Sequence, residues 1–110
     1  MAIARVGRGD VFLVNLNPTR GRELRKTRPC VVVSPDELNT HLRTFIVAPL
    51  TTGAYSYPFR VPCTFQGQAG HVVLDQIRTV DRERLVKCLG TLSVPVIGRT
   101  LAVLREMFAG

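Results

Sequence analysis

The sequence is poor in the residues that mark several common classes of protein. It contains no tryptophan, two tyrosines, five phenylalanines and three cysteines. Cys30, Cys63 and Cys88 are far apart and lie mostly in apolar runs, which favours small buried thiols of a reducing compartment over disulfides or metal ligands. No apolar run is long enough to span a bilayer, and the first residues lack the apolar core of a secretion signal. These absences predict a cytoplasmic protein with no membrane partner, no metal and no cofactor.

Familiar catalytic signatures are also missing. The sequence has no Gly-rich phosphate loop, no closely spaced cluster of His and Cys, and no nucleophile elbow. His41 and His71 titrate near neutrality without help, but neither lies within a motif, so we interpret each as a surface or strand histidine rather than a catalyst. The 110 residues fit one domain, 1–110, with a single core that needs no disulfide.

Positive charge is what the chain has in excess. Fifteen Lys and Arg against eight Asp and Glu give a formal net charge of +7, which favours nucleic acid or another acidic partner. The stretch 20–29 concentrates this charge between two apolar runs. Its charged residues are Arg20, Arg22, Glu23, Arg25, Lys26 and Arg28.

This basic stretch is predicted to be a long loop between strands. Gly21 and the turn residues around Pro18 disfavour a helix, and Pro29 pushes Arg28 toward an extended backbone. Long connections without secondary structure tend to be binding or catalytic loops. The loop is therefore predicted to bind a polyanion, and the alternative is a solvated loop kept soluble by its charge.

The remaining pattern predicts several short strands followed by one helix. The expected strands are 11–16, 30–33, 45–50, 58–63, 71–80 and 86–92, with brief helical turns after Pro35 and near 81–85. Both faces of 11–16 are apolar, which indicates a strand covered on two sides. Pro49 indicates an edge position or a bulge. The pattern as a whole predicts a small, strongly curved sheet or barrel with one helix packed against it.

The helix is expected to begin after Ser93. Its apolar stripe is Val94, Ile97, Leu101, Leu104 and Phe108. Val103 and Met107 lie off that stripe. They belong either to a wide core-facing surface or to a second apolar face used by a partner subunit.

Two groups of residues could bind phosphate or sugar. Arg28 is held by Pro29, and its planar fork could take two phosphoryl oxygens; the alternative is an ion pair with Glu23 or Asp75 that closes the loop. Thr51 and Thr52 follow the third strand, where their hydroxyls could bind a phosphate or simply cap the strand end.

The segment 75–78 combines an acid, an amide and a cation. In a strand, Asp75 and Ile77 would point opposite to Gln76 and Arg78. Amides read base edges and arginines grip phosphates, as single-stranded RNA recognition requires. Aromatic residues for base stacking are scarce near the threonines. They are Tyr55, Tyr57 and Phe59.

A series of short motifs runs in a specific order through almost the whole chain. They are Arg8-Gly9-Asp10-Val11, Asn17-Pro18-Thr19, Gly21-x-Glu23, Thr27-Arg28-Pro29, Ser34-Pro35, Pro49-Leu50-Thr51-Thr52, Tyr57-Pro58-Phe59 and Asp75-Gln76-Ile77-Arg78-Thr79. In this order and spacing they resemble the MazF/PemK toxins of prokaryotic toxin–antitoxin systems. The resemblance implies a mainly β, α+β fold: an SH3-like small barrel of the MazF/PemK/CcdB type with a C-terminal helix. It also implies a homodimer that cleaves single-stranded RNA without a metal and is inhibited by a cognate antitoxin.

The resemblance also implies roles for individual residues. The family's arginine before proline falls on Arg28, and the threonine after its third strand falls on Thr51. These are the expected catalytic residues for attack by the ribose 2′-hydroxyl, which leaves a 2′,3′-cyclic phosphate and a 5′-hydroxyl. The expected RNA-binding residues are Arg20, Arg22, Glu23, Arg25, Lys26, Thr52, Asp75, Gln76 and Arg78. The sequence departs from the family at Leu24, usually Gln, and at Lys26, commonly Gly.

Two other functions fit the same features less well. CcdB toxins share this fold and poison DNA gyrase, but they make that contact with C-terminal residues that include a tryptophan, and this chain contains none. A non-cleaving RNA-binding module would account for the basic loop alone. Mapping RNA ends after incubation in EDTA separates these possibilities.

Overall fold

A computed structural model describes residues 5–23, 26–53 and 56–110. The strands of this part of the chain are β1 (Asp10–Asn15), β2 (Thr27–Val32), β3 (Thr44–Thr52), β4 (Arg60–Phe65), β5 (Gln68–Val73), β6 (Arg78–Asp81) and β7 (Leu85–Thr91). The helices are α1 (Asp36–His41) and α2 (Val94–Met107), with single 3₁₀ turns η1 (Leu74–Gln76) and η2 (Arg82–Arg84). Within the described residues, no helix is long and apolar enough to cross a membrane.

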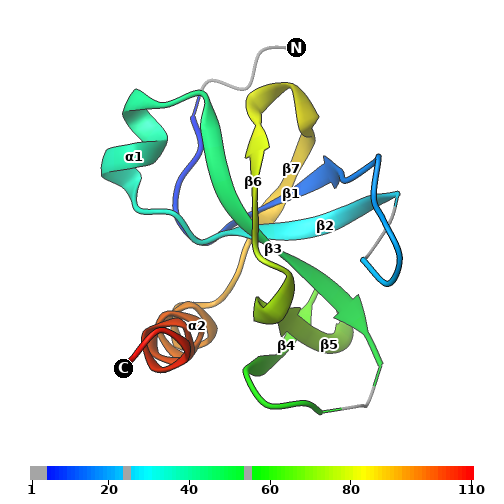
Figure 1. Ribbon diagram of the computed structural model, residues 1–110, viewed down its shortest axis with the longest axis vertical. Coiled ribbons are helices and arrows are strands. Elements are labelled where there is room, and N and C mark those ends of the chain that lie inside the picture. Colours follow the sequence, from blue (N-terminus) through cyan, green and yellow to red (C-terminus); the bar gives the residue numbers. More distant parts are fainter. Residues whose placement is uncertain (1–4, 24–25, 54–55) are drawn as a thin grey trace.

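The strands form one bent antiparallel sheet. Its order is β4-β5-β3-β2-β1-β7, and β6 pairs with β3 beside this path. Figure 1 shows β3 crossing the molecule from the larger group of strands to the small β4–β5 hairpin, with α2 packed to one side. The predicted mainly β fold with a C-terminal helix is confirmed. The sheet is barrel-like but open, because no pairing among the described strands joins β7 to β4.

Pro49 lies in a central strand, so its predicted edge position is wrong. β6 pairs with Thr44–Val47 of β3, and β5 pairs with Leu50–Thr52. Pro49 falls between these two partners and faces β2 across from Cys30. A residue without an N–H is tolerated at this break, because neither β5 nor β6 pairs with it.

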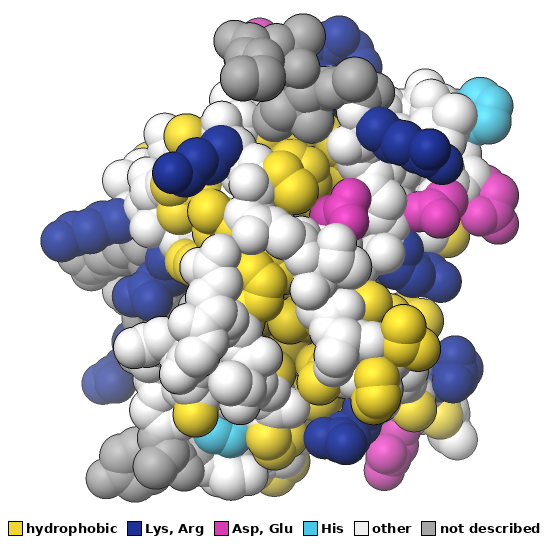
Figure 2. Space-filling model, turned by 180° about the vertical axis from the view of Figure 1, so that it is seen from behind, with side chains coloured by type: hydrophobic (Ala, Val, Ile, Leu, Met, Phe, Trp, Pro, Cys, Tyr) yellow, Lys and Arg dark blue, Asp and Glu magenta, His cyan; other side chains and the backbone are white. Residues whose placement is uncertain are grey.

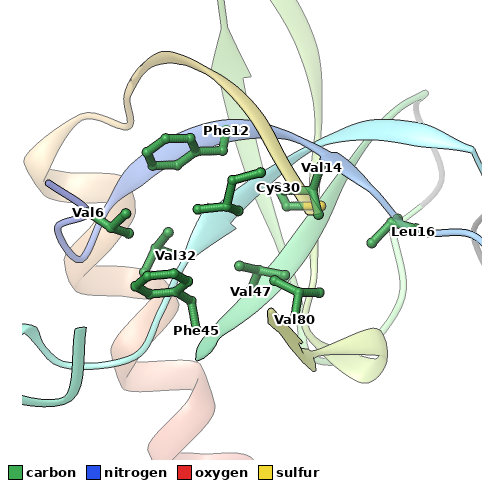
Figure 3. Packing of buried hydrophobic residues seen from close by; sticks show 10 residues of the cluster. Val6, Phe12, Val14, Leu16, Cys30, Val32, Phe45, Val47 and Val80 are labelled. Atoms are coloured by element: carbon green, nitrogen blue, oxygen red, sulfur yellow. The ribbon is translucent and has the colours of Figure 1, made fainter. Parts of the chain in front are cut away.

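Both faces of the sheet are buried, as the apolar pattern of the first strand predicts. Neighbouring residues point to opposite sides, so Val11 and Phe12 enter different clusters, as do Val31 and Val32. Figure 3 shows the first cluster, in which side chains from β1, β2, β3 and β6 face one another. Its members are Val6, Phe12, Val14, Leu16, Cys30, Val32, Phe45, Val47, Val80 and Leu85. Full burial of such a side chain contributes roughly 1.5–3 kcal/mol.

Helix α2 covers the second cluster with a face that only partly matches the predicted stripe. Val94 and Phe108, the two ends of the predicted stripe, are 81% and 72% exposed. Ile97 and Leu104 of the stripe pack against the core, as do Val103 and Met107, which were predicted to lie off it. The surface that contacts the sheet is therefore wider than the predicted stripe. Of the two interpretations of Val103 and Met107, the core-facing one is confirmed.

The turn after Pro35 forms helix α1 without a side-chain cap. Pro35 occupies the N-cap position, and no side chain caps the helix there. Ser34 instead donates its hydroxyl to Asn39 Oδ1 at 2.6 Å and accepts from the Ile46 N–H at 3.1 Å. The serine is thus used to fasten α1 to β3 rather than to begin the helix.

Candidate functional site

Arg28 and Thr51 come from the neighbouring strands β2 and β3. β2 runs antiparallel to β3, with Cys30 opposite Pro49 and Val31 opposite Ala48. Arg28 lies two residues before Cys30 and pairs with Val14 of β1, whereas Thr51 lies two residues after Pro49 and pairs with His71 of β5. The strand β2 begins at Thr27, earlier than predicted. Arg28 is therefore fixed within a sheet rather than at the end of a loop.

Both residues line one hollow of about 280 Å³. Each is half-buried, which keeps the side chain in contact with solvent while restricting its motion. Thr52, predicted to bind RNA, lies in the same hollow. The other lining residues are Pro29, Leu50, Cys63, Phe65, Gln66, Gln68 and Gly70. A guanidinium fork, two hydroxyls and two amides beside apolar side chains can hold both a phosphate and a base.

Gly70 allows β5 to approach Thr51 closely. A Cβ atom built on Gly70 would lie 1.8 Å from the Thr51 carbonyl oxygen and 2.8 Å from its carbonyl carbon. Both are backbone atoms, so neither can rotate away. In the same pairing, Gly70 lies opposite Thr52 and His71 lies opposite Thr51. The position of Thr51 thus depends on the missing side chain at residue 70.

Arginines from the β6 region hold the neck of the β1–β2 loop. The Leu16 N–H donates to the Lys26 carbonyl at 3.0 Å. Arg78 Nη1 donates to the Leu16 carbonyl at 3.0 Å, and Arg84 Nη1 donates to the Asn15 carbonyl at 3.1 Å. Arg78, predicted to contact RNA, therefore also fixes the base of the loop that carries the other cations.

The charges of Arg28 and Arg78 both act on Cys30. Burial raises the pKa of the Cys30 thiol to about 12, while the positive charges of Arg78 and Arg28 act to lower it. The thiol is thus neutral near pH 7 and is a poor nucleophile. The two guanidinium groups nevertheless lie close enough to act on the Cys30 sulfur. Two positive charges therefore lie near this buried thiol.

A second hollow, of about 210 Å³, gathers Glu23, Asp75, Gln76 and Arg78. The predicted alternation through this segment is wrong, because Leu74–Gln76 forms the 3₁₀ turn η1 and β6 begins only at Arg78. The turn is required because the chain passes here from β5 to β6, which pair with different parts of β3. Pro49 lines this hollow and directly precedes the part of β3 that lines the first.

Asp75 is engaged by Arg60. Arg60 Nε and Nη2 donate to the two carboxylate oxygens of Asp75, each at 2.9 Å. This hydrogen bonding lowers the pKa of Asp75 below its ordinary value. The Arg60 guanidinium also lies over the Tyr57 ring, 4.8 Å from its centroid. The carboxylate that the sequence offered as a partner for Arg28 is thus held by another arginine.

The loop cations in the described residues are exposed. They are Arg20, Arg22 and Lys26. Glu23 closes a turn at this end of the loop, because its carboxylate accepts from the Arg20 N–H and its own N–H donates to the Arg20 carbonyl. Arg25, also predicted to bind RNA, and Leu24 lie outside the described residues. Along the left margin of Figure 2, on the side of this loop, the charged side chains in view are all Lys or Arg.

Comparison with known proteins identifies the family. A profile described as "PemK-like, MazF-like toxin of type II toxin-antitoxin system" matches residues 7–108. The chain belongs to this family. It is similar to Endoribonuclease PemK from Escherichia coli, with 36% identity over 107 residues, covering 88% of this chain and 80% of that protein. It also resembles two solved structures from Deinococcus radiodurans. MazF (Form-I) has a TM-score of 0.82 at 27% identity and covers 96% of this chain and 97% of that one. MazE-MazF (Form-I) has a TM-score of 0.76 at 26% identity, with the same coverage.

Lys26, where the resemblance leads us to expect glycine, has an unusual backbone conformation. Lys26 adopts a φ of 65°, in the left-handed region that favours glycine. A residue with a side chain costs roughly 1–2 kcal/mol there. The Lys26 N–H donates to Asn17 Oδ1 at 3.1 Å, which supports this conformation. The backbone at residue 26 thus adopts a conformation typical of glycine, although the residue is a lysine.

Sequence reasoning missed the part of the Arg28 hollow that the β4–β5 hairpin contributes. Phe65, Gln66 and Gln68 line the Arg28 hollow, and Gln66 and Gly67 form the two-residue turn between the strands. The Gln-Gly pair is a recognisable hairpin signal, but it does not reveal where the hairpin docks. Of the aromatics named instead, Tyr57 and Phe59 are exposed, and Tyr55 lies outside the described residues. The described residues contain no group of three His, Cys, Asp or Glu that could hold a metal.

Proposed function

We propose that this MazF/PemK toxin cleaves single-stranded RNA by attack of a ribose 2′-hydroxyl on the adjacent phosphorus, without a metal ion, in the Arg28 hollow. The observation that carries the proposal is that Arg28 and Thr51, which come from neighbouring strands, are both half-buried and line one hollow. Endoribonuclease activity itself agrees with the name of the E. coli relative, PemK. An RNA substrate makes the cytoplasm the expected place of action.

The chemistry assigns a different task to each residue. The 2′-hydroxyl loses its proton as its oxygen bonds to phosphorus, and the 5′-oxygen gains a proton as its bond to phosphorus breaks, which leaves a 2′,3′-cyclic phosphate and a 5′-hydroxyl. Negative charge grows on the non-bridging oxygens, and the Arg28 fork is suited to bind two of them. The Thr51 hydroxyl orients the phosphate or the attacking group. One well-placed donor of this kind contributes roughly 3 kcal/mol to transition-state stabilisation.

RNA would reach this site across the cationic loop. Exposed Arg20, Arg22 and Lys26 supply phosphate contacts that carry no sequence information. The second hollow, with Gln76 and Arg78, adjoins the first along β3 and provides an amide for a base edge. The Asp75 carboxylate is already paired with Arg60, so its contribution to this hollow is made by way of that arginine.

A cognate antitoxin is the expected protein partner. The family profile describes the toxin of a toxin–antitoxin system, and one similar structure is a MazE-MazF assembly. A cationic groove attracts an acidic polypeptide by the same charge that attracts RNA. The antitoxin is therefore expected to compete with RNA for this surface.

The deciding experiment maps the ends of single-stranded RNA after incubation with the purified protein in EDTA. We expect cuts at short motifs that leave a 2′,3′-cyclic phosphate and a 5′-hydroxyl, and no cut where the nucleotide before the scissile phosphate is 2′-deoxy. Activity that vanishes in EDTA and returns with magnesium would overturn the proposed chemistry. Binding without cleavage of any RNA would leave an RNA-binding module.

Variants of Arg28 test its separate role. Arg28→Ala should lower the single-turnover rate at saturating RNA by about a hundredfold or more, and Arg28→Lys should restore little, because a point charge cannot replace a bidentate fork. Arg99→Ala, on an exposed position of α2, is the matched control and should cleave at the normal rate. If Arg28→Ala changes only affinity, Arg28 is a phosphate contact and not a catalytic residue.

A further inference from the structure

His71 is a buried polar residue with no protein partner among the described residues. Only 8% of its surface is exposed, and its ring forms no hydrogen bond with any described residue. Across the same residues, no side-chain nitrogen or oxygen that is sealed from solvent lacks a partner. The ring nitrogens of His71 therefore reach the surface through an opening, where an external group can meet them.

That opening is a hollow of about 510 Å³ on the β4–β5 hairpin. Pro62 lies opposite His71 and Thr64 lies opposite Ala69, so these four side chains share one face of the hairpin. Ser93 and Val96 close the hollow from the start of α2. Its volume lies within the range of small-molecule sites, about 300–1,000 Å³.

The hollow adjoins the proposed cleavage site. Cys63 and Gly70 line both this hollow and the Arg28 hollow. His71 is also the direct cross-strand partner of Thr51 in the β3–β5 pairing. Side chains of such partners leave the same face of the sheet, with Cβ atoms roughly 5 Å apart. Thr51 and His71 therefore present their side chains to the same face of this part of the sheet.

We propose that this hollow binds the base of a nucleotide next to the scissile phosphate and that His71 reads the edge of that base. The inference rests on the proposed RNA cleavage. Neutral imidazole has one donor and one acceptor, which suits the edge of a nucleobase. The walls contributed by Pro62, Ala69 and Val96 are apolar and can cover a base ring. The lining contains no Lys or Arg, so the hollow is suited to a base rather than to a second phosphate.

The test compares sequence preference in His71→Ala, His71→Gln and the wild type. Binding is measured with a set of RNA oligonucleotides that carry a 2′-deoxy nucleotide at the cleavage position and differ at each flanking base. Cleavage is measured on the matching all-ribose set. In His71→Ala, the preference for one base over the others at one flanking position should fall about tenfold, both in binding and in cleavage. The cleavage rate on the least favoured sequences should stay unchanged. His71→Gln, which retains a donor and an acceptor, should restore part of that discrimination.

His41→Ala is the matched control, because His41 is exposed on α1, away from both hollows. It should keep the wild-type preference. An unchanged preference in His71→Ala overturns the base-reading role. A cleavage rate that falls equally on every sequence also overturns the base-reading role, because it would show that His71 is a catalytic or structural residue. Thermal unfolding of each variant distinguishes a structural loss. If the wild type binds the oligonucleotides but cleaves nothing, the proposed chemistry fails while the binding comparison still decides the role of His71.

Discussion

At the scale of single residues, the geometry at Thr51 depends on neighbours that carry no obvious chemistry. Gly70 leaves room for the Thr51 backbone, and Arg60 holds Asp75 beside the second hollow. Neither residue would be recognised as functional from its own type. Each acts by placing another residue, so each can be tested by a substitution that leaves the proposed catalytic side chains intact.

Gly70→Ala should displace Thr51. Because the added Cβ would lie 1.8 Å from a carbonyl oxygen, β5 must shift away from β3. We expect a loss of about 1–3 kcal/mol in the free energy of unfolding, as for other overpacked sites, and a fall of at least about tenfold in the single-turnover rate. Urea denaturation and single-turnover cleavage provide the two measurements.

Gly98→Ala is the control for this prediction. Gly98 lies in α2, and an added Cβ would meet no atom within 4 Å other than the neighbouring backbone of its own helix. It should keep full activity and gain up to about 1 kcal/mol, because alanine is the better helix former. Normal cleavage by Gly70→Ala would show that the close approach at Thr51 has no role in the reaction.

The ion pair between Arg60 and Asp75 predicts a pH-dependent contribution to stability. The pKa of Asp75 is lowered in the folded state, so the contribution is fully present above the ordinary carboxyl pKa of about 4 and is lost as the pH falls through the lowered value. The pair is partly exposed, so its size is about 1 kcal/mol or less.

Urea denaturation of Arg60→Ala should therefore show a deficit at pH 7 that shrinks as the pH falls below about 4. Arg99→Ala should show no such change. A deficit that is constant with pH would mean that Arg60 acts by packing on Tyr57 rather than through the carboxylate.

At the scale of elements, the β1–β2 loop combines a fixed neck with an exposed charged surface. The neck is held by Arg78 and Arg84 through backbone carbonyls, whereas Arg20 and Arg22 reach solvent. Charges of this kind contribute to affinity for any polyanion and little to the chemical step. The loop and the Arg28 strand should thus respond differently to salt.

Single replacements of Arg20, Arg22 or Lys26 by Ala should each weaken RNA binding and reduce the slope of log affinity against log salt concentration by about 0.7, the value for one phosphate contact on a single strand. Sequence preference and the single-turnover rate should stay the same. Fluorescence titration at several salt concentrations measures the slope, with Arg99→Ala as control. A loop variant that loses rate but keeps its slope would contradict this division of roles.

At the scale of the whole molecule, the reason to expect a homodimer changes. Val103 and Met107, for which a partner subunit was one interpretation, pack on the core of the same chain. Large apolar side chains nevertheless remain on the surface. Val86, Val94 and Phe108 are 55%, 81% and 72% exposed. Singly exposed apolar side chains are normal on a monomer, so the expectation of a homodimer rests on the family resemblance.

We predict a homodimer as the working unit, with twice the 12.2 kDa mass of the chain. Sedimentation equilibrium at micromolar concentration should give this mass, and specific activity should fall on dilution through the dissociation range. A monomer at micromolar concentration with undiminished cleavage would contradict the prediction.

Local sequence was sufficient to predict those features that depend on a few neighbouring residues. Alternating apolar runs indicated the strands, the Asp81 turn indicated η2, and a 3.6-residue period indicated α2. Pro29 made Arg28 a local candidate for phosphate binding, whereas the choice of Thr51 as its catalytic partner came from the resemblance to the MazF/PemK family. Side-chain chemistry and backbone preference depend on a few neighbouring residues, so their effects can be predicted from the sequence without knowledge of the fold.

Tertiary structure decided every feature that joins distant segments. The neighbouring positions of β2 and β3 in the sheet bring Arg28 and Thr51 to one hollow, and the passage from β5 to β6 turns Leu74–Gln76 into η1 instead of strand. The same is true of the width of the packed face of α2 and of the hairpin that brings Phe65 to the Arg28 hollow. A one-residue slip in any pairing would reverse which side chains face the hollow, and register follows from the packing of both sheet faces together. No single segment contains that information.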